Sequence, residues 1–303
     1  MAMDTSKLHL PKTVATAVVN KVKETSTIAA LSPSSPQIFT DKEYMIFNGA
    51  AEADVTAEGQ TKSSYEQDLN YVSGKTFKVQ TTTRVTSELK WADEDNRFQI
   101  IQSIQADQAE AIGRALDYVV YHAINPKTGE PLTGFDALTA RAMQVTAGDD
   151  DITNVDNLAD QLNETYDING IAISRTWASR LRKIRVPATG MRYYPEIPLN
   201  LQVGTLDGIK AATSATVNGA KAKTPTHVLA IMGDFSLIKW GMVRDITSEI
   251  IPYGDPDQTG VDLKAHNQIA YRTEAMFSYA VIEPKAFAVL KTSTEELKSF
   301  YGK

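Results

Sequence analysis

Four histidines are the first residues in this 303-residue chain that could bind a metal ion or transfer a proton: His9, His122, His227 and His266. No two of them have the spacing of a metal-binding pair, and an isolated histidine is more often a surface or hydrogen-bonded core residue than a ligand. The chain also contains no cysteine. This excludes disulfide bonds, thiolate nucleophiles and cysteine-ligated zinc. We therefore expect no metal site at the histidines.

Two further motifs suggest phosphate or calcium binding, and neither is complete. Ser73–Thr76 resembles the end of a phosphate-binding loop, but Leu69 stands where that loop requires glycine. The acidic run Asp149–Asp151 lacks the alternate ligands and terminal glutamate of a calcium loop. We interpret it as a turn that leads into a helix N-terminus, where carboxylates are favoured. No Gly-x-Ser-x-Gly nucleophile elbow is present either. The sequence thus predicts no catalytic residue, no cofactor and no metal, and hence no enzyme.

The charge balance argues against a protein whose main task is to grip nucleic acid. The 31 lysines and arginines are outnumbered by 37 aspartates and glutamates, for a formal net charge of -6. Phosphate binding requires a dense basic face, so we expect only non-specific contact with double-stranded DNA. No apolar run reaches the roughly 18 residues of a membrane-spanning helix, and the first residues do not resemble a signal peptide. The sequence predicts no membrane contact and synthesis in the cytoplasm.

The elements that must position any functional side chain begin with an N-terminal arm, residues 1–45. Val14 and Val18 belong to a short amphipathic stretch, and a Ser/Pro-rich segment at 31–36 follows it. β-Branched residues and prolines disfavour a stable helix in such a sequence. We interpret it as an extended arm that other contacts must order.

A projecting hairpin and a long helix are expected next. Apolar residues alternate with polar ones between residues 44 and 91, as at Phe77, which predicts long strands around a polar tip at Glu58–Lys62. The tip has too few apolar residues to bury itself, so we expect it to project. Spacings of three, four and eight between apolar residues predict an amphipathic helix at 93–123 that ends before Pro126.

The second half of the chain predicts an α/β subdomain and a long returning strand. Thr153–Asp156 is typical of a capping box at the start of a helix, and another helix is expected to begin near Ser174. Strands are predicted at 171–173, 228–232 and 269–281. A short apolar segment at 286–290 is expected to close the fold. The Pro/Gly/Tyr-rich segment Val186–Pro198 is too polar and too broken for the core, so it is expected to be a loop.

In this order of elements, the chain resembles the major capsid proteins of tailed phages, which have the Hong Kong 97-like shell fold also found in encapsulins. Nearly the whole chain takes part in the resemblance. Its most specific part has an Arg-x-Glu strand, an apolar run, a proline and Ala-Phe. The segments that carry the resemblance are Ala270–Phe287, Gly233–Ser236, Leu89–Asp93, Thr56–Gly59 and Glu52.

The resemblance implies an α+β fold, the phage capsid (Hong Kong 97-like) fold, in four parts. Residues 1–45 would form the N-terminal arm and 46–90 the extended loop, a β-hairpin. Residues 91–145 with 262–303 would form the peripheral domain with its long spine helix, and 146–261 the axial α/β domain. The implied function is a major capsid protein that assembles as pentamers and hexamers into an icosahedral or prolate shell around the phage genome.

The implied partners are other copies of the chain, the portal protein and a decoration protein. Because no long charged helical segment precedes the arm, we also expect a separate scaffolding protein, or else a chain that has already been trimmed. The virion capsid is the implied location. The residues expected to contact neighbouring subunits are Val14, Val18, Leu31 and Phe39 in the arm, Glu58, Gly59, Lys62 and Tyr65 at the extended-loop tip, and Pro187, Met191, Tyr193 and Tyr194 in the axial loop.

Three alternatives stay open at this point. An encapsulin-type cellular nanocompartment shell would have the same fold and would require a cargo-docking surface. A soluble α/β enzyme would require a converging set of polar residues, which the motifs do not provide. A tail-tube or adhesin subunit would have more strand and no spine helix.

Overall fold

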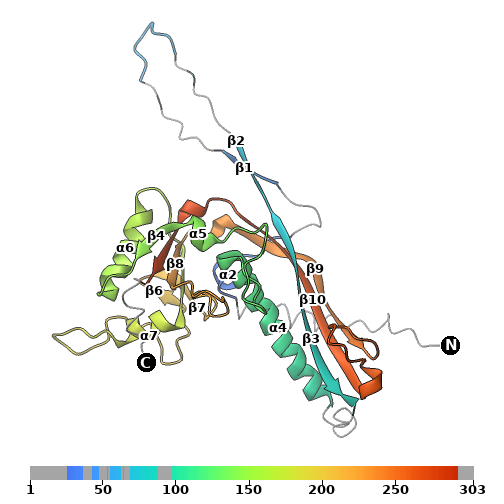
Figure 1. Ribbon diagram of the computed structural model, residues 1–303. Helices are drawn as coiled ribbons and strands as arrows, with labels where there is room; N and C mark the ends of the chain where they lie inside the picture. Colours follow the sequence, from blue (N-terminus) through green and yellow to red (C-terminus); the bar gives the residue numbers. More distant parts are fainter. Residues whose placement is uncertain are drawn as a thin grey trace.

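The protein is described here by a computed structural model, which covers residues 26–36, 43–47, 53, 55–62, 64, 69–87 and 97–292. Figure 1 shows an elongated body with two β-sheets and a narrow two-stranded ribbon that projects away from it. Among the described residues, no helix has both the length and the apolar character needed to span a membrane.

A three-stranded antiparallel sheet, in the order β3-β10-β9, forms one half of the body. Its strands are β3 (Lys75–Thr86), β10 (Gln268–Val281) and β9 (Ile238–Ile251). The long strand predicted at 269–281 is confirmed as β10. Its alternate residues Ala275, Phe277 and Tyr279 turn to one buried face, because successive side chains of a strand point to opposite sides. Phe77 of β3 lies directly opposite Phe277 and extends this apolar face.

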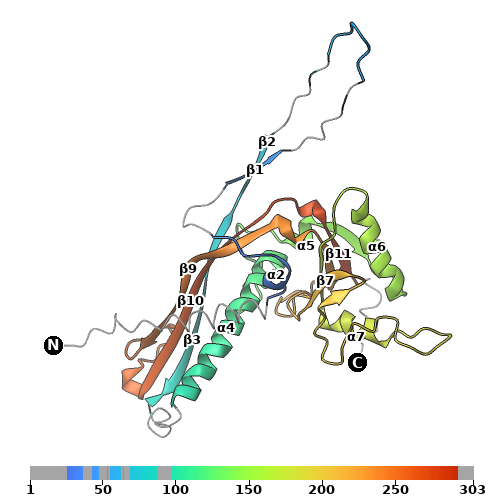
Figure 2. The same cartoon turned by 180° about the vertical axis from the view of Figure 1, so that it is seen from behind.

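The helix α4 (Arg97–His122) covers the apolar face of this sheet, as Figures 1 and 2 show from opposite sides. Helical spacing places Ile112, Leu116 and Val119 on one stripe, and all three side chains are buried. The helix predicted at 93–123 is therefore confirmed over its described part. It ends at His122 because Ala123 adopts a positive φ of 52°, which an α-helix cannot continue.

A six-stranded mixed sheet, in the order β4-β11-β8-β5-β7-β6, forms the other half. Its strands are β4 (Met143–Thr146), β11 (Phe287–Lys291), β8 (Val228–Gly233), β5 (Gly170–Ile173), β7 (Ile209–Thr213) and β6 (Thr205–Leu206). The strands predicted at 171–173 and 228–232 are confirmed as β5 and β8, and the apolar segment at 286–290 contributes to β11. β5 is central and wholly buried, pairing in parallel with β7 and antiparallel with β8.

Both faces of the six-stranded sheet are covered. Ile171 and Ile173 of β5 pack with α6 (Asp151–Asn163) and α7 (Arg175–Lys183), whereas Ala172 faces the core shared with α4. The alternation follows from the two-residue period of a strand. The remaining short elements are α5 (Leu138–Arg141), η2 (Phe235–Leu237), η3 (Lys264–His266) and η4 (Pro284–Ala286).

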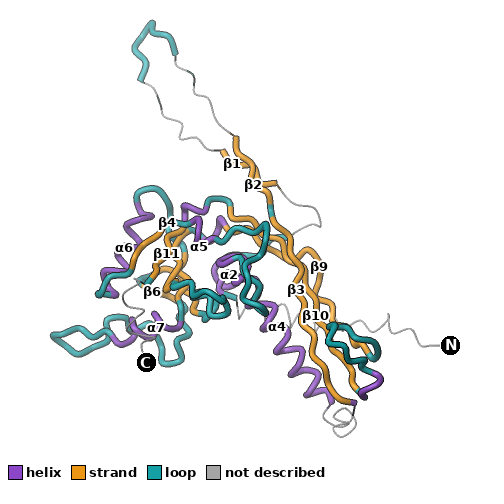
Figure 3. Tube along the Cα trace, in the orientation of Figure 1, coloured by secondary structure: helices purple, strands orange, loops and turns teal. Residues whose placement is uncertain are grey.

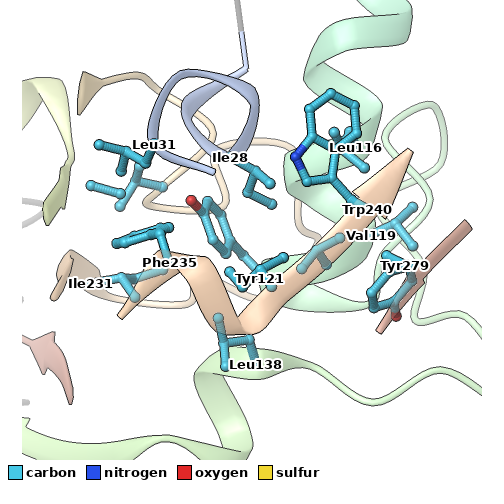
Figure 4. Packing of buried hydrophobic residues seen from close by; sticks show 14 of the residues in the cluster. Ile28, Leu31, Leu116, Val119, Tyr121, Leu138, Ile231, Phe235, Trp240 and Tyr279 are labelled. Carbon is cyan, nitrogen blue, oxygen red and sulfur yellow. The ribbon is translucent and has the colours of Figure 1, made fainter. Parts of the chain in front are cut away.

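A five-residue helix, α2 (Thr27–Leu31), fills the space between α4 and the six-stranded sheet. Figure 4 shows Ile28 and Leu31 of α2 around Tyr121 and Phe235, with the Tyr121 hydroxyl directed toward α2. The helix therefore joins the two halves of the body through one continuous core.

The ribbon consists of β1 (Glu43–Phe47) and β2 (Leu69–Ser73), which pair antiparallel with Met45 opposite Tyr71. Figure 3 shows that it continues the line of β3 and rises away from both sheets. At the far end, the amide of Gln60 donates a hydrogen bond to the carbonyl of Ala57 at 3.1 Å. Gly59 supplies the positive φ of 84° that this turn requires. The predicted polar turn is therefore confirmed in the described residues.

The start of α6 corrects one expectation from the sequence. Thr153 does not cap the helix, since α6 already begins at Asp151. Instead, the Asp150 carboxylate accepts hydrogen bonds from the amides of Ile152 at 3.3 Å and Thr153 at 3.2 Å, and from the Thr153 hydroxyl. Hydrogen bonds from Thr153 lower the pKa of Asp150. The charged carboxylate of Asp150 is a stronger acceptor than the Thr153 hydroxyl for the free amides of a first turn. The acidic run at 149–151 therefore lies at a helix N-terminus, as predicted.

The sheets also divide the chain differently from the expected domain ranges. β9 falls in the range 146–261 but pairs with β10 in the three-stranded sheet. β11 falls in the range 262–303 but pairs with β8 and β4 in the six-stranded sheet. The reason is that β9 and β10 are long enough to carry the chain from one half of the body to the other and back. The chain therefore passes from one half to the other at the start of β9 and returns after β10.

Candidate assembly surfaces

One face of the ribbon exposes apolar side chains. Directly opposite residues of an antiparallel pair share a face, and so do residues two apart along a strand. The register therefore places Met45, Tyr71 and Leu69 together. Their exposed fractions are 55%, 59% and 46%. Because about half of each side chain stays exposed among the described residues, this face is the strongest candidate for a contact with another molecule.

The ribbon tip is polar and fully open to solvent. Glu58, Gly59 and Lys62, three of the residues expected to make contacts, are exposed there, and Val55 nearby is 97% exposed. The fourth expected residue, Tyr65, lies outside the described residues. A Cβ atom added at Gly59 would meet nothing within 4 Å. Glycine is therefore favoured at this position by the positive φ of the turn and not by a lack of room for a side chain.

The loop after α7 folds into a hairpin that projects from the body in Figure 1. The amide of Val186 donates to the carbonyl of Met191 at 2.9 Å, and the amide of Gly190 donates to the carbonyl of Val186 at 2.8 Å. Pro187, Met191 and Tyr193 are exposed, as a contact surface requires. Pro187 and Met191 flank the turn at Val186–Gly190, whereas Tyr193 lies nearer the base of the hairpin, where its amide donates to the carbonyl of Ile184 at 3.1 Å.

Tyr194 is a correction to the expected axial-loop contacts. Only 2% of its surface is exposed, and it packs in the core beneath α6 and α7. Its ring meets that of Tyr193 edge to face, with the centroids 4.9 Å apart. Burial raises the pKa of its hydroxyl well above the usual range. Leu199, which the sequence did not single out, is 72% exposed and adds apolar surface to the same region.

Leu31 is a second correction, because it belongs to the core of its own chain and is only 8% exposed. The Ser/Pro-rich segment that follows is also held internally. The Ser32 hydroxyl donates to the carbonyl of Ile238 at 2.8 Å, and the Ser35 amide donates to the carbonyl of Trp240 at 2.8 Å. Residues 32–36 therefore run along the start of β9, held by hydrogen bonds within their own chain.

The other arm residues expected to make contacts, Val14, Val18 and Phe39, lie outside the described residues.

A buried carboxylate on α4 fixes α2 in place. Asp117 is fully buried, and its Oδ1 accepts hydrogen bonds from Ser26 Oγ at 2.5 Å and from the amide of Ile28 at 3.3 Å. Its Oδ2 accepts from the amide and hydroxyl of Thr27, both at 2.9 Å, and from Thr216 Oγ1 at 2.6 Å. Burial raises the pKa of Asp117, and these hydrogen bonds oppose the shift. Asp117 thus ties the arm segment, α4 and the chain after β7 to one point.

His122, at the end of α4, reinforces the same junction. Its Nε2 lies 3.0 Å from the carbonyl of Thr216 and 3.1 Å from that of Val217. Since both partners only accept, Nε2 carries the proton of a neutral ring. Burial lowers the pKa of His122 to about 4. The histidine is therefore a neutral structural donor at the end of α4.

The Gly233–Ser236 segment makes a tight turn between β8 and β9. A Cβ at Gly233 would lie 2.9 Å from the Cα of Phe287 and would clash with the carbonyl of Ala286, so only glycine fits. Asp234 caps η2 by accepting from the amide of Ser236 at 2.9 Å. This places Phe235, fully buried, edge to face with Phe287.

The ribbon and the loop after α7 both carry exposed apolar side chains, which suit a structural protein that makes contacts with other molecules. The chain belongs to the phage capsid family, whose model matches residues 7–292. No curated protein sequence matches it.

Solved structures agree with the family assignment. A structure from Mycobacterium phage Ogopogo has a TM-score of 0.79 and 30% identity, over 89% of this chain and 92% of that one. A structure from Gordonia phage Cozz has a TM-score of 0.75 and 28% identity, over 89% of this chain and 87% of that one. A structure titled as the capsid of a native GTA particle shares the fold at 11% identity, with a TM-score of 0.59 and coverage of 97% and 95%.

The protein is therefore a major capsid protein with the Hong Kong 97-like fold, and it acts in the virion capsid. The family match favours this assignment over the encapsulin alternative.

Proposed function

We propose that copies of this chain assemble as pentamers and hexamers into an icosahedral or prolate shell around the phage genome. The observation that carries the proposal is the apolar face of the ribbon, formed by Met45, Leu69 and Tyr71, whose side chains stay about half exposed among the described residues. A ribbon that stands away from the body gains packing for this face only by lying on a neighbouring subunit.

The free energy gained by burying the apolar face of the ribbon is small enough for a reversible assembly. Completing the burial of three half-exposed side chains contributes about 1 kcal/mol each, roughly half the value for a fully exposed one. The ribbon contact is therefore weak in a single pair of subunits. Repetition around a closed shell makes it strong, because each subunit is held by several such contacts at once.

We assign the second contact to the axial loop, with Pro187, Met191 and Tyr193 directed at the centre of a pentamer or hexamer. Their joint exposure on a projecting hairpin supports this role. In this scheme the six-stranded sheet with α6 and α7 is the axial domain, and the three-stranded sheet with α4 is the peripheral domain. The ribbon tip, with Glu58, Gly59 and Lys62, extends over the next subunit.

The remaining partners follow from the family resemblance. They are the portal protein, a separate scaffolding protein, a decoration protein and packaged double-stranded DNA bound non-specifically. The net charge of -6 is compatible with DNA that must slide past the inner surface. Synthesis in the bacterial cytoplasm agrees with the lack of cysteine. We assign no catalytic activity, because the candidate motifs in the sequence are incomplete.

A double variant tests the ribbon contact. Met45→Ser with Tyr71→Ser removes most of the apolar face, whereas Asn70→Ser alters an exposed residue of the opposite face and serves as the control. Sedimentation and electron microscopy should show that the double variant leaves more free subunits than wild type at the same concentration. Its thermal unfolding as a free subunit should be unchanged. Equal assembly of the double variant and the control would refute the ribbon contact.

A further inference from the structure

The side chain of Arg84 enters the loop between β9 and β10 and is surrounded there by oxygen atoms. Its Nη2 donates to Asp255 Oδ1 and to Thr259 Oγ1, both at 2.7 Å, and also to the Asp257 carboxylate. Its Nη1 donates to the backbone carbonyl of Val261 at 3.0 Å. Four oxygens of one short loop thus converge on a single positive charge that β3 supplies from more than 170 positions earlier in the chain.

The order of these oxygens is that of a calcium-binding loop. Such a loop uses side chains at its first, third and fifth positions and a backbone carbonyl at the seventh, with glycine at the sixth for a sharp turn. Counting from Asp255, the same places hold Asp257, Thr259, the Val261 carbonyl and Gly260, which has a positive φ of 81°. The match ends at the twelfth position, where His266 replaces the usual bidentate glutamate.

The arrangement differs from an ordinary surface ion pair. Lys78, on the same strand as Arg84, pairs with the single carboxylate of Glu274 at 2.6 Å and its side chain is 56% exposed. The Arg84 side chain is 18% exposed and binds both carboxylates. Hydrogen bonds from Arg84 are also the main cause of the lowered pKa of Asp257. A guanidinium with five donors can satisfy several converging oxygens at once, which an ammonium cannot do with the same geometry.

We propose that residues 255–262 form a calcium-type loop in which the Arg84 guanidinium occupies the position of the metal. Two consequences follow. The wild-type loop stays folded without divalent cations, because its cation is built into β3. Removing that charge converts the loop into a site for Ca²⁺. With only two carboxylates, the affinity should be weak, with a dissociation constant on the order of 10⁻³ M.

The test uses the full-length chain as free subunits, with hydrogen exchange of residues 252–267 as the readout. Arg84→Ala should accelerate exchange in this loop about tenfold in EDTA. Calcium chloride at about 10 mM, well above the expected dissociation constant, should return it close to the wild-type rate. Wild type and Lys78→Ala, the control on the same strand, should exchange equally with and without Ca²⁺. Arg84→Ala combined with Asp257→Asn should lose the Ca²⁺ response.

Two results would overturn the proposal. One is an Arg84→Ala loop that exchanges fast with or without Ca²⁺, since the oxygens would then not form a cation site. The other is a wild-type loop whose exchange slows equally in Ca²⁺, since Arg84 would then not occupy the site. Should Arg84→Ala fail to fold, Arg84→Gln keeps part of the stem without the charge. It is expected to give the same Ca²⁺-dependent slowing.

Discussion

Replacing Asp117 with alanine should detach α2 from the body. The Asp117 carboxylate accepts five hydrogen bonds, and two of the donors are the backbone amides of Thr27 and Ile28. Side-chain hydroxyls can rotate toward other acceptors, but these two amides are fixed by the helix that they begin. The variant therefore leaves at least two buried donors without a partner.

The expected cost follows from those donors. An unsatisfied buried donor destabilises a protein by about 1–3 kcal/mol. Two of them, with partial loss of the hydroxyl contacts, should lower the free energy of unfolding by about 3–5 kcal/mol, which is in the upper range for one substitution. Asp117→Asn should cost nearly as much, because its amide group would place two donors against the donors of α2.

Urea unfolding of the free subunit measures this change, and hydrogen exchange at Thr27 and Ile28 localises it. Asp107→Ala is the matched control, because Asp107 is an exposed aspartate on the same helix. The control should stay within about 0.5 kcal/mol of wild type. If Asp117→Ala were as stable as Asp107→Ala, with α2 still protected from exchange, the idea that this carboxylate fastens the arm segment would be wrong.

Two other substitutions test separate parts of the fold. The pKa of His122 is about 4 in the folded protein and about 6.5 in the unfolded chain. Between these pH values the unfolded state binds more protons than the folded state. The free energy of unfolding should therefore fall by about 3 kcal/mol as the pH drops from 6.5 to 4. His122→Gln should flatten that slope in urea titrations, while His266→Gln, at an exposed site, should leave it intact. Gly233→Ala should cost about 3 kcal/mol through its clash with the Phe287 backbone, and Gly204→Ala, with nothing within 4 Å, should be neutral in the same assay.

The long elements could be predicted from the sequence because their patterns are local. The helix α4 and the strand β10 each repeat an apolar spacing over many residues, so their type and buried face follow from periodicity alone. The polar turn at Gly59 follows in the same way from turn chemistry.

The burial of Leu31 and Tyr194 could not be predicted from the sequence, because it depends on contacts with residues far away in the chain or in another part of the fold. Leu31 is buried because Asp117, about 90 positions later, binds the start of its helix. Tyr194 lies in a loop of polar composition, yet it reaches the core beneath α6 and α7. The exposure of Leu199 is likewise decided by how that loop folds and not by its apolar type.

The sequence alone shows only part of the calcium-type loop. The alternation of Asp255, Asp257 and Thr259, followed by Gly260, is present in the sequence. What no local pattern could show is that the cation comes from Arg84 on β3, because that pairing exists only once the three-stranded sheet has formed.

Negative-stain electron microscopy of the purified, concentrated protein, combined with its mass by light scattering, tests most directly whether this chain builds a shell. Rings of five or six subunits, or closed polyhedral particles, are the expected result. A monodisperse monomer that stays monomeric when a scaffolding partner is co-expressed would contradict it.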